Sequence, residues 1–198
     1  MQPPVPFVGL TGGLGAGKST ALAVLESLGA AVISSDAVVH ELYAGPELRD
    51  AVVERFGAGV APGGVVDRAA VARHAFATAE DRAWLEGLIW PQVGERVAAW
   101  LTQARALSPP PRAAVVEVPL LFEAGLQELY DATIAVISEE GLRRSRAAAR
   151  GHELVDERAA RQLTQEEKSR RATFTVRNDG SEADLQRELS AVLDKLGG

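Results

Sequence analysis

The stretch GGLGAGKST, residues 12–20, has the residue spacing of a phosphate-binding loop. Glycines leave the backbone N–H groups uncovered, so successive peptides can turn around a phosphate. Lys18 stands where a lysine reaches the β- and γ-phosphates, and Ser19 where a hydroxyl binds Mg²⁺. A glycine-rich turn that only reverses the chain is the disfavoured alternative, so the motif predicts a nucleoside triphosphate site. Its candidate residues are Gly12, Gly13, Gly15, Ala16, Gly17, Lys18, Ser19 and Thr20.

A carboxylate, Asp36, follows the apolar segment Ala31–Ser35. In a doubly wound sheet, ligands collect at the carboxyl ends of the strands. A carboxylate there can accept the proton of a substrate hydroxyl. It can equally serve only as the N-cap of the helix that follows. Position alone leaves both interpretations open.

Arginines are concentrated in the helix expected after residue 138. They are Arg143, Arg144, Arg146 and Arg150. Arg146 and Arg150 are four residues apart and therefore share one helix face. Such a helix can close over a nucleotide as a lid, place guanidinium groups against the transferring phosphoryl, and exclude water. The alternative is a solvated basic face paired with neighbouring glutamates.

These residues need elements that position them, and five apolar segments separated by helical patterns are candidates. The expected strands are Val5–Leu10, Ala31–Ser35, Ala113–Val118, Ala132–Ile137 and Thr173–Arg177. The helices expected beside them are Lys18–Leu28, Asp36–Tyr43, two arginine-rich helices across Glu139–Arg171, and Glu182–Leu196. Strands that alternate with helices predict an α/β fold of the P-loop type, with a doubly wound parallel sheet of about five strands.

The block at residues 37–111 contains no convincing strand. This holds also for its segment Pro46–Phe56. Helical patterns cover Arg68–Phe76 and Glu80–Leu107, with a Gly/Pro-rich loop before them at Gly57–Gly64. Pro91 predicts a break inside the second pattern, because proline removes a helical hydrogen bond. The block therefore has the character of a helical insertion.

Composition limits the classes of function. A chain of 198 residues without cysteine predicts one compact domain with no disulfides or thiolate metal sites. The net charge of −6 argues against a protein that coats nucleic acid. No apolar run approaches the roughly 20 residues of a membrane span, and residues 1–6 lack the features of a signal peptide. These features predict a cytoplasmic protein with neither nucleic acid nor membrane as partner, and they do not indicate an oligomeric state.

Other nucleotide-binding proteins are partly excluded. A Ras-like GTPase carries Asn-Lys-x-Asp and an Asp-x-x-Gly after its third strand, and neither occurs there in this chain. Two alternatives stay open on the residues alone: a small-molecule or nucleotide kinase with another acceptor, and an ATP-binding regulator without turnover.

The sequence resembles the dephospho-coenzyme A kinase family over nearly its whole length. The loop motif is shared by many enzymes, whereas the remaining similar segments are more specific. The similar segments are GLTGGLGAGKST at 9–20, VISSDAVVHEL at 32–42, VVDRAAVARHAF at 65–76, EVPLLFEAG at 117–125 and RAARQLTQEEKSRRATFTVRNDGS at 158–181. Ser34, Trp90 and Thr173 depart from the family pattern, which commonly has aspartate, histidine and aspartate there.

The resemblance implies transfer of the ATP γ-phosphoryl to the ribose 3′-hydroxyl of dephospho-coenzyme A, with Mg²⁺ as cofactor. It implies that Asp36 accepts the proton, and the loop motif and the arginine cluster add Lys18 and Arg146 as catalytic groups. It also implies contacts to the nucleotide and the acceptor elsewhere in the chain. These are Arg146, Arg150 and Asn178 for ATP, and Asp36, His40, Arg68, Pro119, Leu120 and Leu121 for the acceptor.

The resemblance also implies how one kinase domain, residues 1–198, is divided. The core would comprise residues 1–36, 112–137 and 173–198, the acceptor-binding insertion residues 37–111, and the lid residues 138–172.

Overall fold

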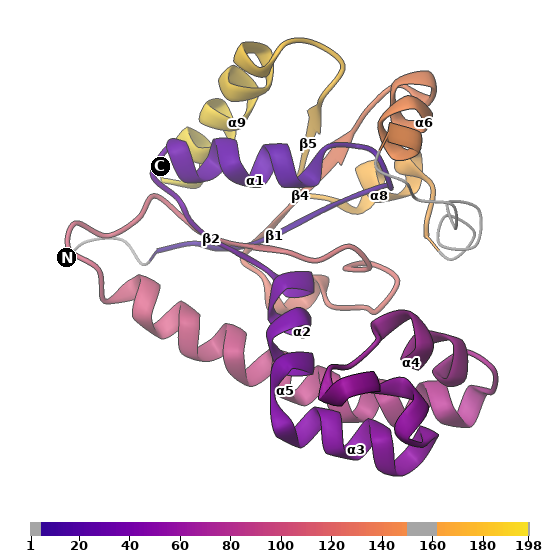
Figure 1. Cartoon of the computed structure of the whole chain (residues 1–198). Coiled ribbons are helices and arrows are strands. Elements are labelled where there is room, and N and C mark those ends of the chain that lie inside the picture. The colour runs from indigo at the N-terminus through magenta and orange to yellow at the C-terminus, as the bar shows by residue number, and fades with distance from the viewer. Residues whose placement is uncertain (1–4, 150–161, 198) are drawn as a thin grey trace. The chain divides into compact units, whose positions relative to one another are not determined.

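The computed structural model of the chain describes residues 5–149 and 162–197 (Figure 1). It consists of two compact units, each described here by itself. The first unit comprises residues 1–34 and 101–198, and the second comprises residues 35–100. Within the described ranges, no helix is long and apolar enough to cross a membrane.

The first unit contains a five-stranded parallel sheet in the order β2-β3-β1-β4-β5. Its strands are β1 (Phe7–Gly12), β2 (Ala31–Ser34), β3 (Ala114–Glu117), β4 (Ala132–Ile137) and β5 (Phe174–Arg177). The expected α/β fold with a parallel sheet is confirmed. β1 is the central strand, with Leu10 opposite Glu117 of β3 and Ile134 of β4.

β1 extends two residues beyond its expected end, because Thr11 and Gly12 pair with Ala135 and Val136 of β4. The first glycine of the phosphate-binding motif is therefore part of the central strand. This pairing fixes the point at which the loop leaves the sheet.

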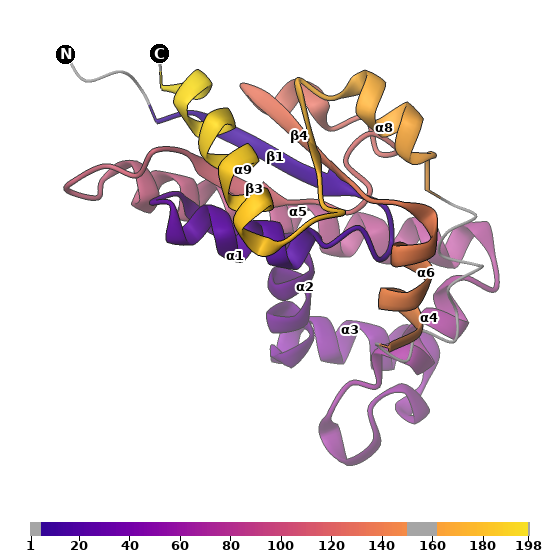
Figure 2. The same ribbon diagram turned by 90° about the horizontal axis from the view of Figure 1, so that it is seen from above.

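Helices cover both faces of this sheet. The helices α1 (Lys18–Ser27) and α9 (Glu182–Leu196) lie side by side on one face (Figures 1 and 2), where Leu10 is fully buried with Leu25 and Leu189. Thr11, the next residue along β1, contacts Lys168 of α8 (Gln165–Arg171). Successive side chains of a strand point to opposite faces, so α8 covers the other face.

Capping boxes fix the starts of α8 and α9. The Thr164 hydroxyl accepts a hydrogen bond from the Glu167 N–H, and the Glu167 carboxylate accepts one from the Thr164 N–H. Ser181 and Asp184 form the same arrangement at α9. Each box satisfies two backbone donors that a helix start otherwise leaves without a partner.

The second unit is helical, as the sequence predicts for this block. Its elements are α2 (Ser35–Ala44), α3 (Pro46–Phe56), the 3₁₀ turns η1 (Ala58–Val60) and η2 (Pro62–Gly64), α4 (Arg68–Ala75), and α5 (Ala79–Arg105), whose last turn belongs to the first unit. Phe56 stacks on His74 at 5.5 Å between ring centroids and meets Trp84 edge-on at 5.4 Å. This aromatic cluster joins α3, α4 and α5.

The expected break at Pro91 is wrong, because α5 is continuous from Ala79 to Arg105. The Gln92 side-chain amide donates to the Leu88 carbonyl at 2.8 Å, which adds a hydrogen bond to the turn that proline disturbs. Leu85 and Ile89 are buried on the same helix. Burial of such residues offsets the local cost of a proline, about 3 kcal/mol in a helix interior.

Candidate active site

The phosphate-binding motif forms the turn between β1 and α1. Gly15 and Gly17 have φ angles of 75° and 92°, a left-handed conformation that favours glycine. A Cβ on Gly17 would overlap the Asn178 amide, and one on Gly12 would overlap the Val136 carbonyl. Backbone conformation and close packing therefore both require glycine in this loop. Ala16, fully buried, tolerates its methyl group.

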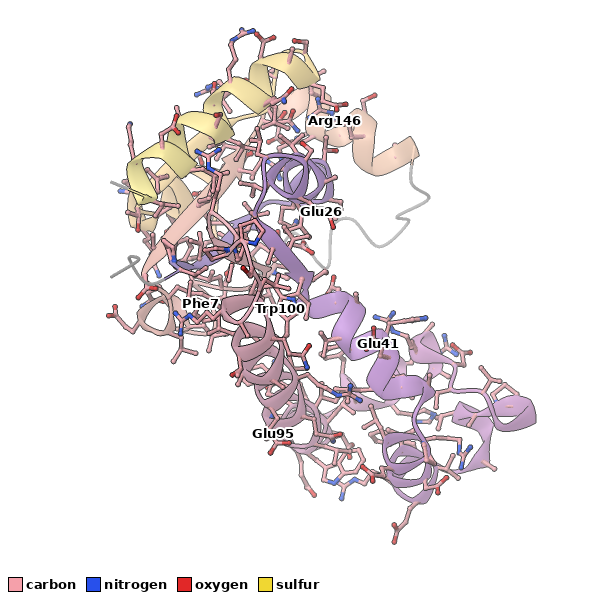
Figure 3. All side chains as sticks on the ribbon, turned by 90° about the vertical axis from the view of Figure 1, so that its left-hand side faces the viewer. Phe7, Glu26, Glu41, Glu95, Trp100 and Arg146 are labelled. Carbon is pink, nitrogen blue, oxygen red and sulfur yellow. The ribbon has the colours of Figure 1, made fainter. Side chains whose placement is uncertain are left out.

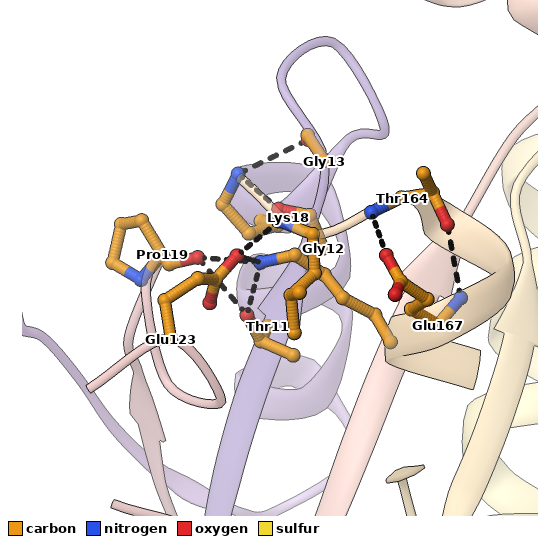
Figure 4. A network of polar contacts seen from close by, with 10 residues as sticks. Thr11, Gly12, Gly13, Lys18, Pro119, Glu123, Thr164 and Glu167 are labelled. Atoms are coloured by element: carbon orange, nitrogen blue, oxygen red, sulfur yellow. Dashed lines mark hydrogen bonds and ion pairs between the residues drawn. The ribbon is translucent and has the colours of Figure 1, made fainter. Parts of the chain in front are cut away.

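Lys18 is the first residue of α1, and its ammonium group reaches back over the loop (Figure 4). The Nζ atom donates to the Gly12 and Gly13 carbonyls at 3.1 and 3.2 Å. Lys18 therefore lies at the loop, and its contact with the β- and γ-phosphates stays a prediction. The same first turn carries Ser19, which is exposed, and Thr20.

Two side chains from outside the motif hold its carbonyl groups. The Asn178 amide donates to the Ala16 carbonyl at 2.9 Å, and the Arg143 Nε donates to the Leu14 carbonyl at 3.1 Å. Asn178 follows β5 directly, and Arg143 lies on α6 (Glu140–Ala149). The loop is therefore fastened to two elements that lie far from it in the sequence.

The Arg146 guanidinium is held where α6 adjoins the rest of its unit (Figure 3). Its Nη1 donates to the Ser138 hydroxyl at 3.2 Å and to the Asn178 carbonyl at 2.9 Å. Arg146 and Asn178, both expected at the nucleotide, are thus brought together. Arg150 lies outside the described residues.

The turn after β3 carries the three apolar residues expected at the acceptor. The Pro119 carbonyl accepts from Thr11 Oγ1 at 3.2 Å and from Lys168 Nζ at 2.8 Å (Figure 4). Leu120 is 42 % exposed, whereas Leu121 is fully buried against Gly9. Of these two leucines, only Leu120 is exposed.

Lys168 and Glu123 form a buried ion pair beside this turn. Lys168 Nζ lies 2.9 Å from Glu123 Oε1, which also accepts from the Leu163 N–H at 2.8 Å. Burial lowers the pKa of Lys168, and the Glu123 carboxylate partly opposes that shift. The pair connects the α8 segment to the turn at Pro119 and to the end of β1.

Ser34, at the end of β2, donates its hydroxyl hydrogen to Glu117 Oε2 at 2.7 Å. Glu117 ends β3 and is 7 % exposed, so this bond compensates part of its burial. Thr173, another departure from the family pattern, exchanges two 3.0 Å hydrogen bonds with Thr133 at the start of β4 and β5. Trp90, on α5, is 54 % exposed.

In the second unit, Asp36 is exposed in the first turn of α2. The helix begins at Ser35, so Asp36 lies inside it and not at the N-cap position. The interpretation of Asp36 as the N-cap is therefore not supported. A carboxylate in the first turn of a helix is stabilised by the helix dipole.

His40 and Arg68 meet within the second unit. Arg68 Nη1 lies 3.3 Å from His40 Nδ1, and the guanidinium carbon lies 5.8 Å from the centre of the Tyr43 ring. Asp67 caps α4 by accepting from the Ala69 and Ala70 N–H groups, which fixes Arg68 at the helix start. Burial raises the pKa of Tyr43, and the Arg68 charge partly opposes this.

Sequence reasoning assigned no individual role to three of these residues. Arg143 belongs to the arginine cluster, but the sequence analysis selected Arg146 and Arg150 from that cluster because they share one helix face. Lys168 and Glu123 lie 45 residues apart, and no periodicity links them. The one feature of the sequence that could have pointed to this pair is that Lys168 lies in the segment 158–181, which resembles the family.

Comparison with known proteins identifies the relatives of this arrangement. Residues 6–184 match the family model described as dephospho-CoA kinase. A dephospho-CoA kinase from Deinococcus radiodurans is 38 % identical over 192 residues, covering 96 % of this chain and 91 % of that protein.

Solved structures are similar as well. A Thermus thermophilus crystal structure is 34 % identical and superposes with a TM-score of 0.83, covering 99 % of this chain and 100 % of the other. The dephospho-CoA kinase of Campylobacter jejuni superposes with a TM-score of 0.62 over 96 % of this chain and 97 % of the other. At 23 % identity it supports the fold alone. Because the family model spans most of the chain, and the Deinococcus relative matches it almost end to end, the chain belongs to the dephospho-CoA kinase family, the ATP-using phosphotransferases of the final step in coenzyme A synthesis.

Proposed function

We propose that ATP binds on the loop at residues 12–20 and that its γ-phosphoryl is transferred to the ribose 3′-hydroxyl of dephospho-coenzyme A. The observation that carries this proposal is the conformation of the loop. Gly15 and Gly17 have left-handed backbone conformations, and the Lys18 ammonium donates to two carbonyl groups of the loop. Backbone N–H groups of Gly13, Gly15 and Gly17 suit phosphate oxygens, assisted by the positive end of the α1 dipole, whereas the Ala16 N–H donates to the Gly13 carbonyl at 3.2 Å. Lys18 supplies a charge that strengthens as the bond between the β- and γ-phosphates breaks.

Asp36 is the group proposed to accept the proton. The 3′-hydroxyl oxygen attacks the γ-phosphorus, the bond to the bridging oxygen breaks, and ADP leaves. The hydroxyl proton passes to the Asp36 carboxylate, which orients the hydroxyl for in-line attack.

His40 and Arg68 are proposed to bind the acceptor, together with the turn Pro119–Leu121. The acceptor carries a diphosphate, and an arginine fork at a helix start suits such an anion. The 3.3 Å contact between Arg68 and His40 supports a shared site for the two side chains. Asn178, whose amide is bonded to the Ala16 carbonyl, is proposed to act on ATP through the loop that it supports.

Arg146 and Arg150 are proposed to stabilise the transferring phosphoryl from the lid, residues 138–172. Guanidinium groups neutralise charge that develops on the equatorial oxygens of the transferring phosphoryl. The other proposed boundaries are a core of residues 1–36, 112–137 and 173–198, and an acceptor-binding insertion of residues 37–111.

Mg²⁺ is proposed to bind the Ser19 hydroxyl and the ATP phosphates. Among the described residues, no group of three or more His, Cys, Asp or Glu side chains is arranged to hold a metal ion. This fits Mg²⁺, which keeps several waters and is usually held by substrate phosphates with one or two protein ligands. When bound, the ion would neutralise part of the phosphate charge.

The test is an acceptor panel with Mg-ATP, in which ADP release is measured with dephospho-coenzyme A, nucleoside monophosphates and small alcohols. We expect strong acceleration by dephospho-coenzyme A alone, with the phosphate placed on the 3′-oxygen by phosphorus NMR. ADP release that is equal for every acceptor would contradict the proposal.

A further inference from the structure

Arg143 is the residue of α6 that contacts the phosphate-binding loop most directly. Its Nε donates to the Leu14 carbonyl at 3.1 Å, and its Nη1 pairs with Glu140 Oε2 at 3.0 Å. The side chain is 19 % exposed, and its bond to Leu14 is partly buried, whereas the Glu140 side chain is 60 % exposed. A guanidinium with two fixed partners cannot swing freely.

The backbones also approach closely here. A Cβ on Gly15 would collide with the Arg143 carbonyl oxygen, and one on Gly13 would lie 3.0 Å from Arg143 Nη2. The glycines of the loop thus serve this contact as well as the turn itself. The first turn of α6 rests directly on the loop.

The bond to Leu14 determines the direction of a neighbouring donor. In a planar trans peptide the C=O and N–H groups point in opposite directions. The Leu14 carbonyl points to Arg143, so the Gly15 N–H of the same peptide points away from it. Asn178 has the same effect on the peptide between Ala16 and Gly17. Its amide donates to the Ala16 carbonyl and so sets the direction of the Gly17 N–H.

We propose that Arg143 is a positioning residue for nucleotide binding, which holds the Leu14 carbonyl outward and thereby aims the Gly15 N–H at a phosphate of ATP. This rests on the proposed function of the loop. The guanidinium also polarises the peptide that it holds, which strengthens the Gly15 donor. Through Arg143, the position of the proposed lid helix and the shape of the phosphate site are coupled.

Arg144 offers a matched control for this proposal. It is the next residue on the helix and pairs with the same carboxylate, Glu140, at 3.1 Å. Its side chain is 78 % exposed. Arg143→Gln and Arg144→Gln therefore remove the same charge and one ion pair to the same partner, but only the first removes the bond to the loop.

The experiment compares the Kd of ATP, measured by calorimetry, with the KM of dephospho-coenzyme A. For Arg143→Gln we expect ATP binding to weaken about 10-fold, the effect of losing one charge-assisted hydrogen bond. The acceptor KM should stay within about twofold, and Arg144→Gln should leave both values within about twofold, because exposed ion pairs contribute little. Arg143→Lys keeps a charge without the fork, and we expect intermediate affinity from it.

Equal ATP affinities of the two glutamine variants would overturn the proposal, as would equal weakening of ATP and acceptor binding in Arg143→Gln. If Arg143→Gln does not fold, the Arg143→Lys variant decides, and wild-type ATP affinity in it would overturn the proposal. Lys18→Ala separates this inference from the proposed function. If that variant keeps wild-type ATP affinity and turnover, the assignment of the loop is wrong and both proposals fall.

Discussion

The Lys168 ammonium and the Glu123 carboxylate lie 2.9 Å apart in the interior of the first unit, with the lysine side chain fully buried. Lys168 also donates to the Pro119 carbonyl and to Thr11 Oγ1. Glu123 Oε2 is buried and has no hydrogen-bond partner among the described residues. The pair is therefore strongly interdependent: each charge is tolerated because the other is present.

Removing one member of this pair should destabilise the protein severely. We expect Lys168→Met to lower the free energy of unfolding by about 3–5 kcal/mol, because Glu123 is left as an uncompensated buried charge. Urea denaturation measures the loss. The exposed Lys195 provides the control, and Lys195→Met should change the stability by less than about 0.5 kcal/mol. A double variant, Lys168→Met with Glu123→Gln, should regain part of the stability, and no recovery would contradict the interpretation.

Lys18 tests the phosphate-binding loop. We expect Lys18→Ala to lower kcat by orders of magnitude, because its charge is needed most as the β–γ bridge breaks. Steady-state kinetics with saturating dephospho-coenzyme A measure this, with Lys195→Ala as a control of equal charge change. Near wild-type turnover in Lys18→Ala would falsify the assignment.

Asp36 should matter for proton transfer and little for folding. We expect Asp36→Asn to lower kcat by roughly 10²–10⁴ while ATP affinity is unchanged, because asparagine keeps the shape but cannot take the proton. The cost in stability should be at most about 1 kcal/mol, since only a first-turn charge is lost. Glu41→Gln, on the same helix and also exposed, should have wild-type kinetics. Full activity of Asp36→Asn would mean that another group accepts the proton.

For Arg146 we expect a larger loss of turnover than of stability. An arginine that touches the transferring phosphoryl can contribute on the order of 10³–10⁵ in rate, so Arg146→Ala should lower kcat far more than it lowers the melting temperature. Its bonds to Ser138 and to the Asn178 carbonyl point to a structural role as the alternative. In that case the melting temperature falls and kcat does not. Arg144→Ala is the control on the same helix.

Tyrosine ionisation should be coupled to alkaline unfolding. Burial raises the pKa of Tyr130, which packs against Phe7 at 4.7 Å between ring centroids, to about 12. The neutral phenol is favoured by the fold, so its contribution to stability is complete below the unfolded pKa of about 10 and is lost as the pH rises toward 12. The chain has one other tyrosine, Tyr43, so in a Tyr43→Phe variant the tyrosinate absorbance reports Tyr130 alone. A midpoint near pH 10 with circular dichroism unchanged would contradict this expectation.

The sheet was predictable from the sequence because its buried parallel strands appear as short apolar runs, such as Ala132–Ile137, between helical patterns. The phosphate-binding loop was predictable because its chemistry depends on residues that are consecutive in the chain. The continuity of α5 through Pro91 was not, since it depends on packing by Leu85 and Ile89 that local propensity does not contain.

The supports of the loop were unpredictable for a related reason. The bond from Arg143 to Leu14 joins residues 129 positions apart, and the bond from Asn178 to Ala16 joins residues 162 positions apart. The sequence analysis chose Arg146 and Arg150 because residues four positions apart share one face of a helix. Spacing alone does not show which face of the helix packs against another element, so it could not identify Arg143. The contact between His40 and Arg68 likewise depends on how α2 and α4 pack.

The central position of β1 has a consequence for the dynamics of the loop. Amide hydrogens of a strand paired on both sides become accessible to solvent only when neighbouring strands separate, so they exchange with deuterium among the slowest in a domain. Val8, Gly9 and Leu10 are paired with both β3 and β4, and the strand continues through Gly12, the first residue of the loop, which is paired with Val136 of β4 alone. The loop therefore starts from a part of the molecule that opens late, and we expect the exchange protection of β1 to persist through each cycle of nucleotide binding and release.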